Sequence, residues 1–174
     1  MAHLNIVLHE PEIPANTGNI GRTCVATGTR LHLIKPLGFD ISDKAVRRAG
    51  LDYWPLVKVH VHENFAELLA AYPDAPFFYA STKAPRSYAQ AEYPRDVFLV
   101  FGRESRGLPE NLLERVYDRC IRIPMIEGAR SLNLSNSVAI VTYEAFRQHG
   151  FEHLLDHGAL TGRDEEPGAW MDYL

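Results

Sequence analysis

Short apolar runs rich in β-branched and aromatic residues recur along this chain, and segments with helical periodicity lie between them. This alternation is the feature that most constrains the fold, because strands separated by helices pair in parallel and need cover on both faces. The runs expected to form strands are Leu4–His9, Leu31–Ile34, Val57–Val61, Pro76–Ala80, Val97–Phe101 and Ile121–Met125. The sequence therefore predicts an α/β fold with a single, mostly parallel sheet flanked by helices.

Capping residues and helical spacing delimit the helices expected between these strands. Ser42 can cap a short amphipathic helix that ends before Gly50, and Pro109 is expected at a first helical position. Near the N-terminus, two prolines are expected to delay the helix until Asn19. The expected helices are Asn19–Thr27, Ser42–Ala49, Asn64–Tyr72, Pro109–Tyr117 and Asn133–Gln148.

The length of 174 residues suits one domain, and a hydrophobic fraction of 46% is enough for a core. We expect a domain over residues 1–158 and an acidic tail over residues 159–174. The net charge of −4 argues mildly against nucleic-acid binding, but the end of the chain supplies most of it: without Arg163–Leu174, 17 basic residues face 18 acidic ones. Binding to phosphates needs only a local basic patch.

Other sequence features argue against secretion, a membrane span and a metal site. Cys24 and Cys120 are isolated, no apolar run is long enough to span a bilayer, and the start has no secretory leader. We therefore expect a cytoplasmic protein with no membrane partner. His149, His153 and His157 recur at the spacing of metal ligands on a helix, but Gly150 interrupts that helix, so no metal is expected.

The first polar motif, HEPEIPANTGNIGRTCVATG, follows the first expected strand. It lacks the GxGxxG pattern of dinucleotide-binding folds. Asn16, Asn19 and Arg22 lead into a helix. Judged by residue type alone, Asn16 or Thr17 could simply cap that helix, with Arg22 an ordinary surface residue.

The second motif, FGRESRG, ends a buried strand at Gly102. Glycine there would let a ligand or another chain approach the backbone closely. A plain strand-to-helix turn would explain the glycines, but it does not explain the polar run Arg103–Arg106. Open α/β sheets bind ligands at the carboxyl ends of their strands, so this run is a candidate binding loop.

The third motif, RSLNLSNSVAIVTYEA, precedes and enters the last helix. One polar residue would suffice to cap that helix, whereas four polar residues alternate with leucines here, which favours a pocket. The helix itself is apolar over a broad arc, at Val138, Ile140, Val141, Tyr143, Ala145 and Phe146. A helix of this kind is buried on more than one side, so we expect a partner against it.

Together the three segments resemble the motifs of the SPOUT-class (SpoU/TrmH-like) RNA 2′-O-ribose methyltransferases, over Asn5 to about Gly150. The resemblance implies a SPOUT fold with a C-terminal trefoil knot, S-adenosyl-L-methionine as cofactor, tRNA as partner, and a homodimer through the C-terminal helix. Within the class the chain is most similar to small enzymes that methylate the wobble cytidine or modified uridine of leucine tRNAs. Two alternatives are an enzyme of the same class that methylates another tRNA position or ribosomal RNA, and a non-catalytic module that binds RNA or a nucleotide.

The resemblance also implies roles for individual residues. The residues implied in catalysis are Arg22, Glu104, Asn133 and Tyr143, and those implied in cofactor binding are Ala80, Gly102, Ile123, Ser131 and Leu132. Asn16 is expected at the RNA, as are Lys44, Arg47 and Arg48 on the short basic helix. Because a guanidinium is always charged and a poor proton acceptor, Arg22 is expected to hold phosphate and stabilise a developing alkoxide. The identity of the general base stays open.

Overall fold

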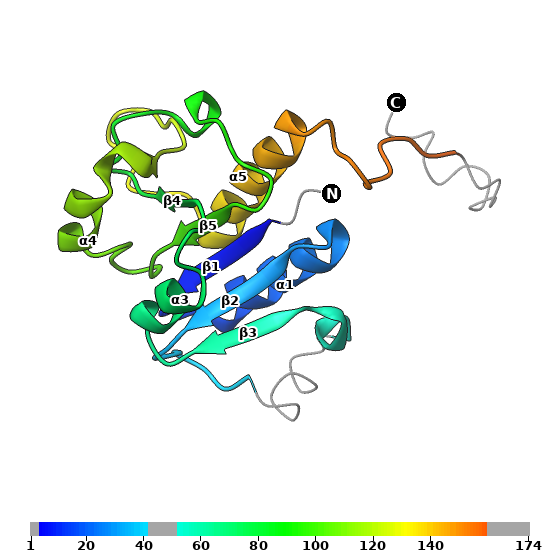
Figure 1. The fold of residues 1–174 in the computed structure, drawn as a ribbon, viewed down its shortest axis with the longest axis horizontal. Helices are drawn as coiled ribbons and strands as arrows, with labels where there is room; N and C mark the ends of the chain where they lie inside the picture. The colour runs from blue at the N-terminus through cyan, green and yellow to red at the C-terminus, as the bar shows by residue number, and fades with distance from the viewer. Residues whose placement is uncertain (1–3, 42–51, 160–174) are drawn as a thin grey trace, which may run out of the picture.

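The computed structural model describes residues 4–41 and 52–159, and its centre is a six-stranded parallel sheet (Figure 1). The strand order is β3-β2-β1-β5-β4-β6. The strands are β1 (Asn5–His9), β2 (Arg30–Ile34), β3 (Val59–His62), β4 (Phe77–Ala80), β5 (Phe98–Phe101) and β6 (Cys120–Ile121). The predicted α/β class with a parallel sheet is confirmed.

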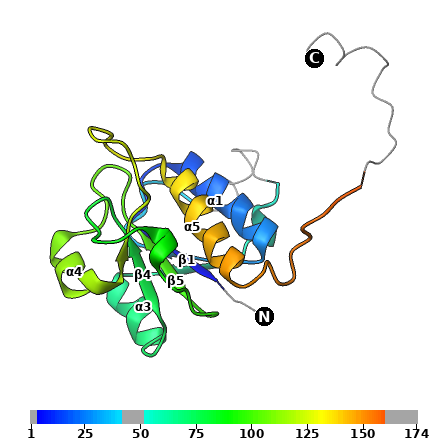
Figure 2. The same ribbon diagram turned by 90° about the horizontal axis from the view of Figure 1, so that it is seen from above.

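Helices cover both faces of the sheet, as Figure 2 shows from above. One face carries α1 (Pro14–Thr27) and α5 (Leu134–Gln148), which lie side by side, and the other carries α3 (Phe65–Ala71) and α4 (Glu110–Arg115). Each face has its own apolar core. Three short 3-10 helices complete the described elements: η1 (Trp54–Leu56), η2 (Tyr88–Gln90) and η3 (Tyr117–Arg119).

The register of the strands brings several loops to one edge of the sheet. Phe101, the last residue of β5, pairs with Leu8 in β1 and with Ala80, the last residue of β4. Ala80 also pairs with Ile121, where β6 ends. The loops that leave β1, β4, β5 and β6 therefore emerge close together, at the carboxyl edge where parallel sheets bind ligands.

The helix starts differ from the sequence-based expectation, by five residues in α1 and by one residue in α3, α4 and α5. Helix α1 begins at Pro14 rather than at Asn19. Proline is tolerated in a first helical turn because its missing N–H would be unpaired there anyway, so it does not delay the helix. In α4, Pro109 is the N-cap residue and Glu110 is the first helical residue.

The last strand is shorter than expected, because β6 ends at Ile121 rather than at Met125. Beyond it, the Arg122 amide donates to the carbonyl of Arg86 at 2.9 Å, and the Arg122 carbonyl accepts from the Tyr88 amide at 2.8 Å. The chain thus leaves the sheet and pairs with the segment after β4. The expected helix Ser42–Ala49, with Lys44, Arg47 and Arg48, lies outside the described residues, as do residues 160–174.

A cluster of histidines lies under α3 where β2 meets β3. His32 is fully buried, and its Nδ1 lies 3.0 Å from Nε2 of His62, while its Nε2 lies 3.4 Å from Oδ1 of Asn5. His60 stacks on the His32 ring at a centroid distance of 4.9 Å. Burial and the neighbouring His60, His62 and Arg30 lower the pKa of His32 to about 3.

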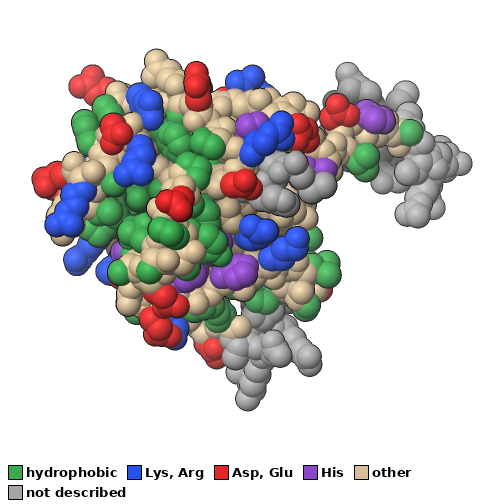
Figure 3. All heavy atoms as spheres, viewed as in Figure 1, with side chains coloured by type: hydrophobic (Ala, Val, Ile, Leu, Met, Phe, Trp, Pro, Cys, Tyr) green, Lys and Arg blue, Asp and Glu red, His purple; other side chains and the backbone are tan. Residues whose placement is uncertain are grey.

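Charges of both signs are interspersed on the face that Figure 3 shows, so no field of a single sign covers it. Within residues 4–41 and 52–159, no helix is both long and apolar enough to cross a membrane. The same residues contain no group of three or more His, Cys, Asp or Glu side chains placed to hold a metal ion. His149 instead lies 2.9 Å from the Tyr93 carbonyl, and His153 packs edge-on against Phe146.

Candidate active site

A cavity of about 680 Å³ opens at the carboxyl edge of the sheet, between the loops that carry the three polar motifs. The structure brings to its wall all the residues that the sequence assigned to cofactor binding: Ala80, Gly102, Ile123, Ser131 and Leu132. They come from β4, from the loop after β5, and from the long connection between β6 and α5. Segments more than 40 residues apart in sequence therefore form one site.

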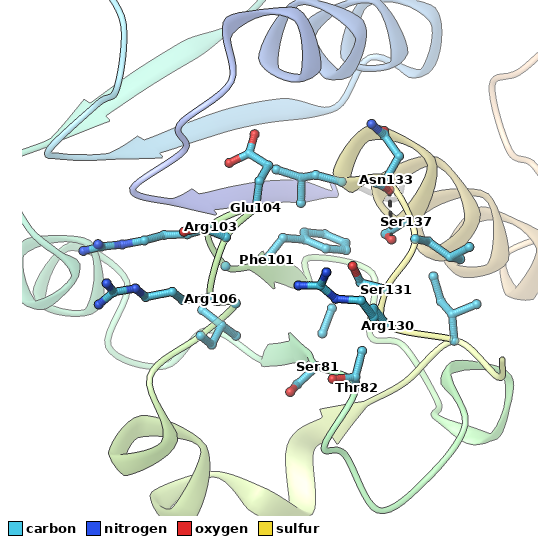
Figure 4. Close-up of a pocket in the computed structure, with 18 of the residues that line it drawn as sticks. Ser81, Thr82, Phe101, Arg103, Glu104, Arg106, Arg130, Ser131, Asn133 and Ser137 are labelled. Carbon is cyan, nitrogen blue, oxygen red and sulfur yellow. Dashed lines mark hydrogen bonds between the residues drawn. The ribbon is translucent and has the colours of Figure 1, made fainter. Parts of the chain in front are cut away.

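The cavity combines an apolar base with polar and charged groups around it (Figure 4). Phe101 is drawn in the middle of the view, and Ile121, Ile123 and Val141 add further apolar lining. Ser81 and Thr82 lie on one side of the cavity, and Ser131 lies nearer to α5. Apolar walls with polar groups that orient the ligand are what a pocket for a small organic cofactor needs.

A chain of hydrogen bonds joins the three motifs beside the cavity. The Glu104 carboxylate accepts from the backbone amides of Glu12 at 2.9 Å and Ile13 at 3.2 Å, and from the side-chain amide of Asn16 at 3.0 Å. The side-chain oxygen of Asn16 accepts in turn from Nδ2 of Asn133 at 3.0 Å. Asn16 is 6% exposed, and both the nitrogen and the oxygen of its side chain have protein partners.

The same network determines where two helices begin. The N-cap residue of α1 is Ile13, whose side chain cannot accept a hydrogen bond. The free amide of Ile13 at this helix start is instead bound by the Glu104 carboxylate, from another motif. The side-chain oxygen of Asn133 caps α5, where it accepts from the amides of Ser135 and Asn136 at 2.9 and 3.3 Å. Asn133 therefore does cap its helix, while its Nδ2 holds the first motif.

A second set of contacts fastens the first motif to the second. Glu12 accepts from the amide and the hydroxyl of Ser105 at 2.9 and 2.8 Å, and Arg103 forms an ion pair with Glu10. Glu10 has a left-handed backbone, with φ of 52°. Burial and the nearby Arg103 lower the pKa of His9, which precedes this turn. The two loops thus form one hydrogen-bonded unit.

Gly102 is required by the chain's own backbone. A Cβ at this position would lie 2.1 Å from the carbonyl carbon of Gly107 and 2.2 Å from the amide nitrogen of Leu108. Gly107 itself has φ of 70°, and its amide donates to the Arg103 carbonyl at 2.8 Å. The segment that approaches Gly102 closely is thus the chain's own backbone, and a side chain at position 102 would break this turn.

Four basic residues line the cavity, and they differ in their partners. Lys83 pairs with Glu110 and Arg103 with Glu10. Arg106 and Arg130 are exposed, and within the described part of the chain neither has an acidic partner. In Figure 4 the Arg130 side chain reaches toward the centre of the cavity, whereas Arg103 and Arg106 point to one side.

Two of the residues implied in catalysis do not line this cavity. Arg22 lies on the exposed side of α1, where its guanidinium carbon is 4.7 Å from the centre of the Tyr53 ring. Tyr143 lies on α5 with 45% of its surface exposed. The structure therefore brings Glu104, Asn133 and Asn16 together at the cavity and leaves Arg22 and Tyr143 on the outer surface of the chain.

The sequence reasoning missed several residues of the cavity. Ser81 and Thr82 directly follow β4, and polar residues after a buried strand are the signal that could have found them. Arg130, next to Ser131, carried the same kind of signal within the third motif. Glu12 lies outside the cavity lining and gave no signal, because its role depends on Ser105, which is distant in sequence.

Comparison with known proteins decides the family. The model of the SpoU rRNA methylase family matches residues 3–143. The chain belongs to this family. A tRNA (cytidine(34)-2′-O)-methyltransferase of Escherichia coli (strain K12) is 48% identical to this SpoU-family chain over 149 residues, which cover 85% of the chain and 95% of that protein.

Solved structures of SpoU-type proteins have the same fold. One was described in a study of 2′-OH methylation of C/U34 on tRNA; it is 45% identical, with a TM-score of 0.80, and the match covers 86% of this chain and 98% of that one. The SpoU methyltransferase AviRb from Streptomyces viridochromogenes, in complex with the cofactor AdoMet, is 23% identical, with a TM-score of 0.72 over 86% of this chain and 62% of that one. As a SpoU methylase, the protein is an RNA methyltransferase, and its parallel α/β sheet is that of the family.

Proposed function

We propose that this protein transfers a methyl group from S-adenosyl-L-methionine to the ribose 2′-hydroxyl of the wobble nucleotide of tRNA, a cytidine or modified uridine in leucine tRNAs. The observation that carries the proposal is the convergence of all three motifs on one cavity in a SpoU-family chain. The E. coli relative's activity at cytidine 34 supports the choice of nucleotide. The proposed setting is the cytoplasm.

The cavity fits the proposed cofactor. Its volume of about 680 Å³ lies within the range of small-molecule sites, and Leu132 and Ile123 supply apolar contacts for an adenine ring and a methionine chain. Ser131, Ser81 and the backbone of the Gly102 turn offer polar contacts, and Ala80 leaves room beside β4. When bound, S-adenosyl-L-methionine supplies a methyl group already activated by its sulfonium.

The protein's contribution is then mainly positioning. Because every carboxylate oxygen of Glu104 already accepts protein N–H groups, we assign Glu104 and Asn133 to holding the three loops in place rather than to proton transfer. The transfer would exchange the bond between the methyl carbon and sulfur for a bond between the methyl carbon and the ribose oxygen, with the demethylated cofactor leaving and the hydroxyl proton passing to solvent water. Arg22 holds RNA phosphate and stabilises the developing negative charge on that oxygen.

We propose that Arg22 and Tyr143 reach the site of a partner subunit in a homodimer formed through α5. Their positions outside the cavity support this arrangement, as does the exposed Tyr143 on a helix where Val138, Val141, Ala145 and Phe146 are buried. Asn16, Lys44, Arg47 and Arg48 are the proposed RNA contacts. Of these, Asn16 lines the cavity, and its side chain is already hydrogen-bonded to Glu104 and Asn133. RNA would therefore contact the backbone at this position.

A C-terminal trefoil knot is also part of the proposal. The segment between β4 and β5 contacts β6 through Arg122, and it contacts the end of α5 through Gln148, whose Nε2 donates to the Ala91 carbonyl at 2.8 Å. Both contacts are expected if the connection from β6 to α5 threads through the loop formed by the segment between β4 and β5, which would make the knot.

Methyl transfer from labelled S-adenosyl-L-methionine to total tRNA tests the activity. Nuclease mapping should place the label on a ribose at position 34 of leucine tRNAs. Ribosomal RNA is tested in parallel as the alternative substrate. Label found only in ribosomal RNA would replace the proposed substrate. No transfer to any RNA, with a folded protein that binds the cofactor, would favour the non-catalytic alternative.

Replacing Arg22 separates the two halves of the proposed site. Arg22→Ala should lower the methylation rate by about 100-fold or more, as is typical when a preorganised donor at the reacting oxygen is lost. Cofactor affinity measured by calorimetry should not change, because Arg22 lies outside the cavity. A normal rate would show that Arg22 has no such role.

Mixing two inactive variants tests the composite site. Ser131→Trp should fill the cavity without entering the core, since Ser131 is exposed. If sites are shared between subunits, mixtures of Arg22→Ala and Ser131→Trp chains recover part of the activity. If subunits exchange and no activity returns, each site belongs to one chain.

A further inference from the structure

The segment that leads into β3 packs on α1 at the turn that carries Arg22. The Tyr53 hydroxyl donates to the Gly18 carbonyl at 2.7 Å, and the face of the Tyr53 ring lies under the Arg22 guanidinium at 4.7 Å. The next residue, Trp54, lies against Gly21. Two consecutive aromatic residues therefore contact one turn of the helix.

Gly21 allows this close packing. A Cβ there would lie 2.9 Å from Cζ3 and 3.1 Å from Cε3 of Trp54, and 3.4 Å from Cγ2 of Val57. The shortest of these distances is below any that real Cβ atoms tolerate, so a side chain at position 21 would push the indole away. Because Tyr53 and Trp54 are adjacent, the same shift would move the Tyr53 ring from Arg22.

The stack leaves the hydrogen-bonding groups of Arg22 available. Arg22 is exposed, and within the described ranges it has no carboxylate partner and no other ring contact. An aromatic face holds a guanidinium through its π-system, so the N–H edges stay free for phosphate or a developing alkoxide. An unsupported arginine would spread over many rotamers and would lose that freedom on binding RNA.

We propose that Tyr53 is a positioning residue, whose ring holds the Arg22 guanidinium in a fixed orientation toward the tRNA. This inference rests on the proposed function of Arg22. The hydroxyl bond to Gly18 fixes the ring, and the contact of Trp54 with Gly21 fixes the segment. Tyr53 acts through Arg22, so its effect must vanish when Arg22 is absent.

A double-mutant cycle tests this dependence. Tyr53→Leu removes the ring, and in the full-length protein it should lower kcat about two- to fivefold at saturating tRNA and cofactor, which is the size of a cation–π contact at an exposed site. The Kd for S-adenosyl-L-methionine should not change. In an Arg22→Ala background, Tyr53→Leu should have no further effect on the single-turnover rate.

Conservative variants separate the ring from the hydroxyl. Tyr53→Phe and Tyr53→Trp keep an aromatic face and should retain most of the activity. If Tyr53→Phe, with a normal Tm, loses as much activity as Tyr53→Leu, the ring is not the active element and the proposal fails. The proposal also fails if Tyr53→Leu lowers the single-turnover rate of Arg22→Ala by the same factor as it lowers the rate of the wild type.

A signal independent of activity and of stability comes from the NMR resonance of the Arg22 Nε–H. The ring current of Tyr53 should displace it in the wild type and in Tyr53→Phe, and Arg22→Lys identifies the signal by its loss. If Tyr53→Leu does not fold, an undisplaced resonance in the wild type still overturns the stack. A normal rate for Arg22→Ala would refute the role of Arg22, whereas an inactive Arg22→Ala with a normal Tyr53→Leu would refute only the present inference.

Discussion

Two polar clusters lie on this sheet, one beside the cavity and one beneath α3. In the first, Asn16 joins the Glu104 carboxylate to Asn133, and the three residues come from three separate motifs. In the second, His32 lies between Asn5 and His62 on neighbouring strands. The first cluster borders an open cavity with exposed arginines, whereas the centre of the second is fully buried among aromatic rings.

The difference shows that a buried polar group does not by itself mark a functional site. Both ring nitrogens of His32 are engaged within the sheet, so this buried histidine presents nothing to a ligand. The Glu104 cluster also uses its polar atoms internally, but in doing so it holds Ser131, Leu132 and the Gly102 turn around a cavity. What distinguishes a site here is the space that the network encloses, and variants of each cluster should differ accordingly.

The largest effect should come from breaking the turn that supports the cavity. Gly102→Ala places a Cβ 2.1 Å from the Gly107 carbonyl carbon, a contact with backbone that no rotamer relieves. We expect a loss of about 3 kcal/mol or more in the free energy of unfolding, together with loss of cofactor binding. Denaturant unfolding and calorimetry measure the two.

Gly158→Ala is the matched control, because a Cβ at Gly158 would meet no atom within 4 Å. It should leave both stability and cofactor affinity unchanged. A Gly102→Ala protein as stable as the wild type would mean that the turn is compliant and that the cavity does not depend on it.

A smaller loss should follow from removing the carboxylate at the centre of the first cluster. Glu104→Ala leaves the amides of Glu12 and Ile13 and the side chain of Asn16 without their acceptor, which should cost about 2 to 3 kcal/mol of stability. Cofactor affinity should fall as well, since the loops are no longer joined. Glu63→Ala, which breaks only an exposed pair with Lys35, should change stability by less than about 1 kcal/mol. Normal cofactor affinity in Glu104→Ala would show that the network does not shape the cavity.

Much of the fold could be predicted from local patterns, and the errors lie where distant residues intervene. The buried strand β5 is apolar throughout and β1 has an apolar centre at Ile6–Leu8, so their positions follow from the sequence. The start of α1 does not, because the carboxylate that caps it belongs to Glu104, in another motif. The end of β6 depends on Arg86 and Tyr88, which bind Arg122 in place of a neighbouring strand.

Most of the residues that form the candidate site could be named from the sequence, but their contacts with one another could not. Motif resemblance named Ser131 and Leu132 as cofactor-binding residues, and both line the cavity. It could not reveal that the partner of Gly102 is the backbone of Gly107, nor that Arg22 lies apart from the cavity on the Tyr53 ring. These are contacts between distant segments, and residue type alone does not determine them.

The smallest of the three effects should come from the histidine cluster, and it should depend on pH. The pKa of His32 is about 3 in the folded protein against an ordinary value of 6.5, chiefly because of burial. Between these values the unfolded chain binds a proton that the folded protein excludes, so stability is fully present above about pH 6.5 and is lost as the pH falls. One such group should cost about 2 kcal/mol between pH 7 and pH 5.

His32→Gln should remove this dependence, because glutamine can still donate and accept a hydrogen bond but does not titrate. His62, whose pKa is also lowered by burial, should leave a residual slope. His157→Gln changes an exposed histidine and should leave the pH profile as in the wild type. Cofactor affinity at pH 7 should be the same in all three proteins, since the cluster lies away from the cavity. If His32→Gln keeps the wild-type slope, acid sensitivity arises elsewhere; if it weakens cofactor binding, the two clusters are coupled through the sheet and the contrast between them fails.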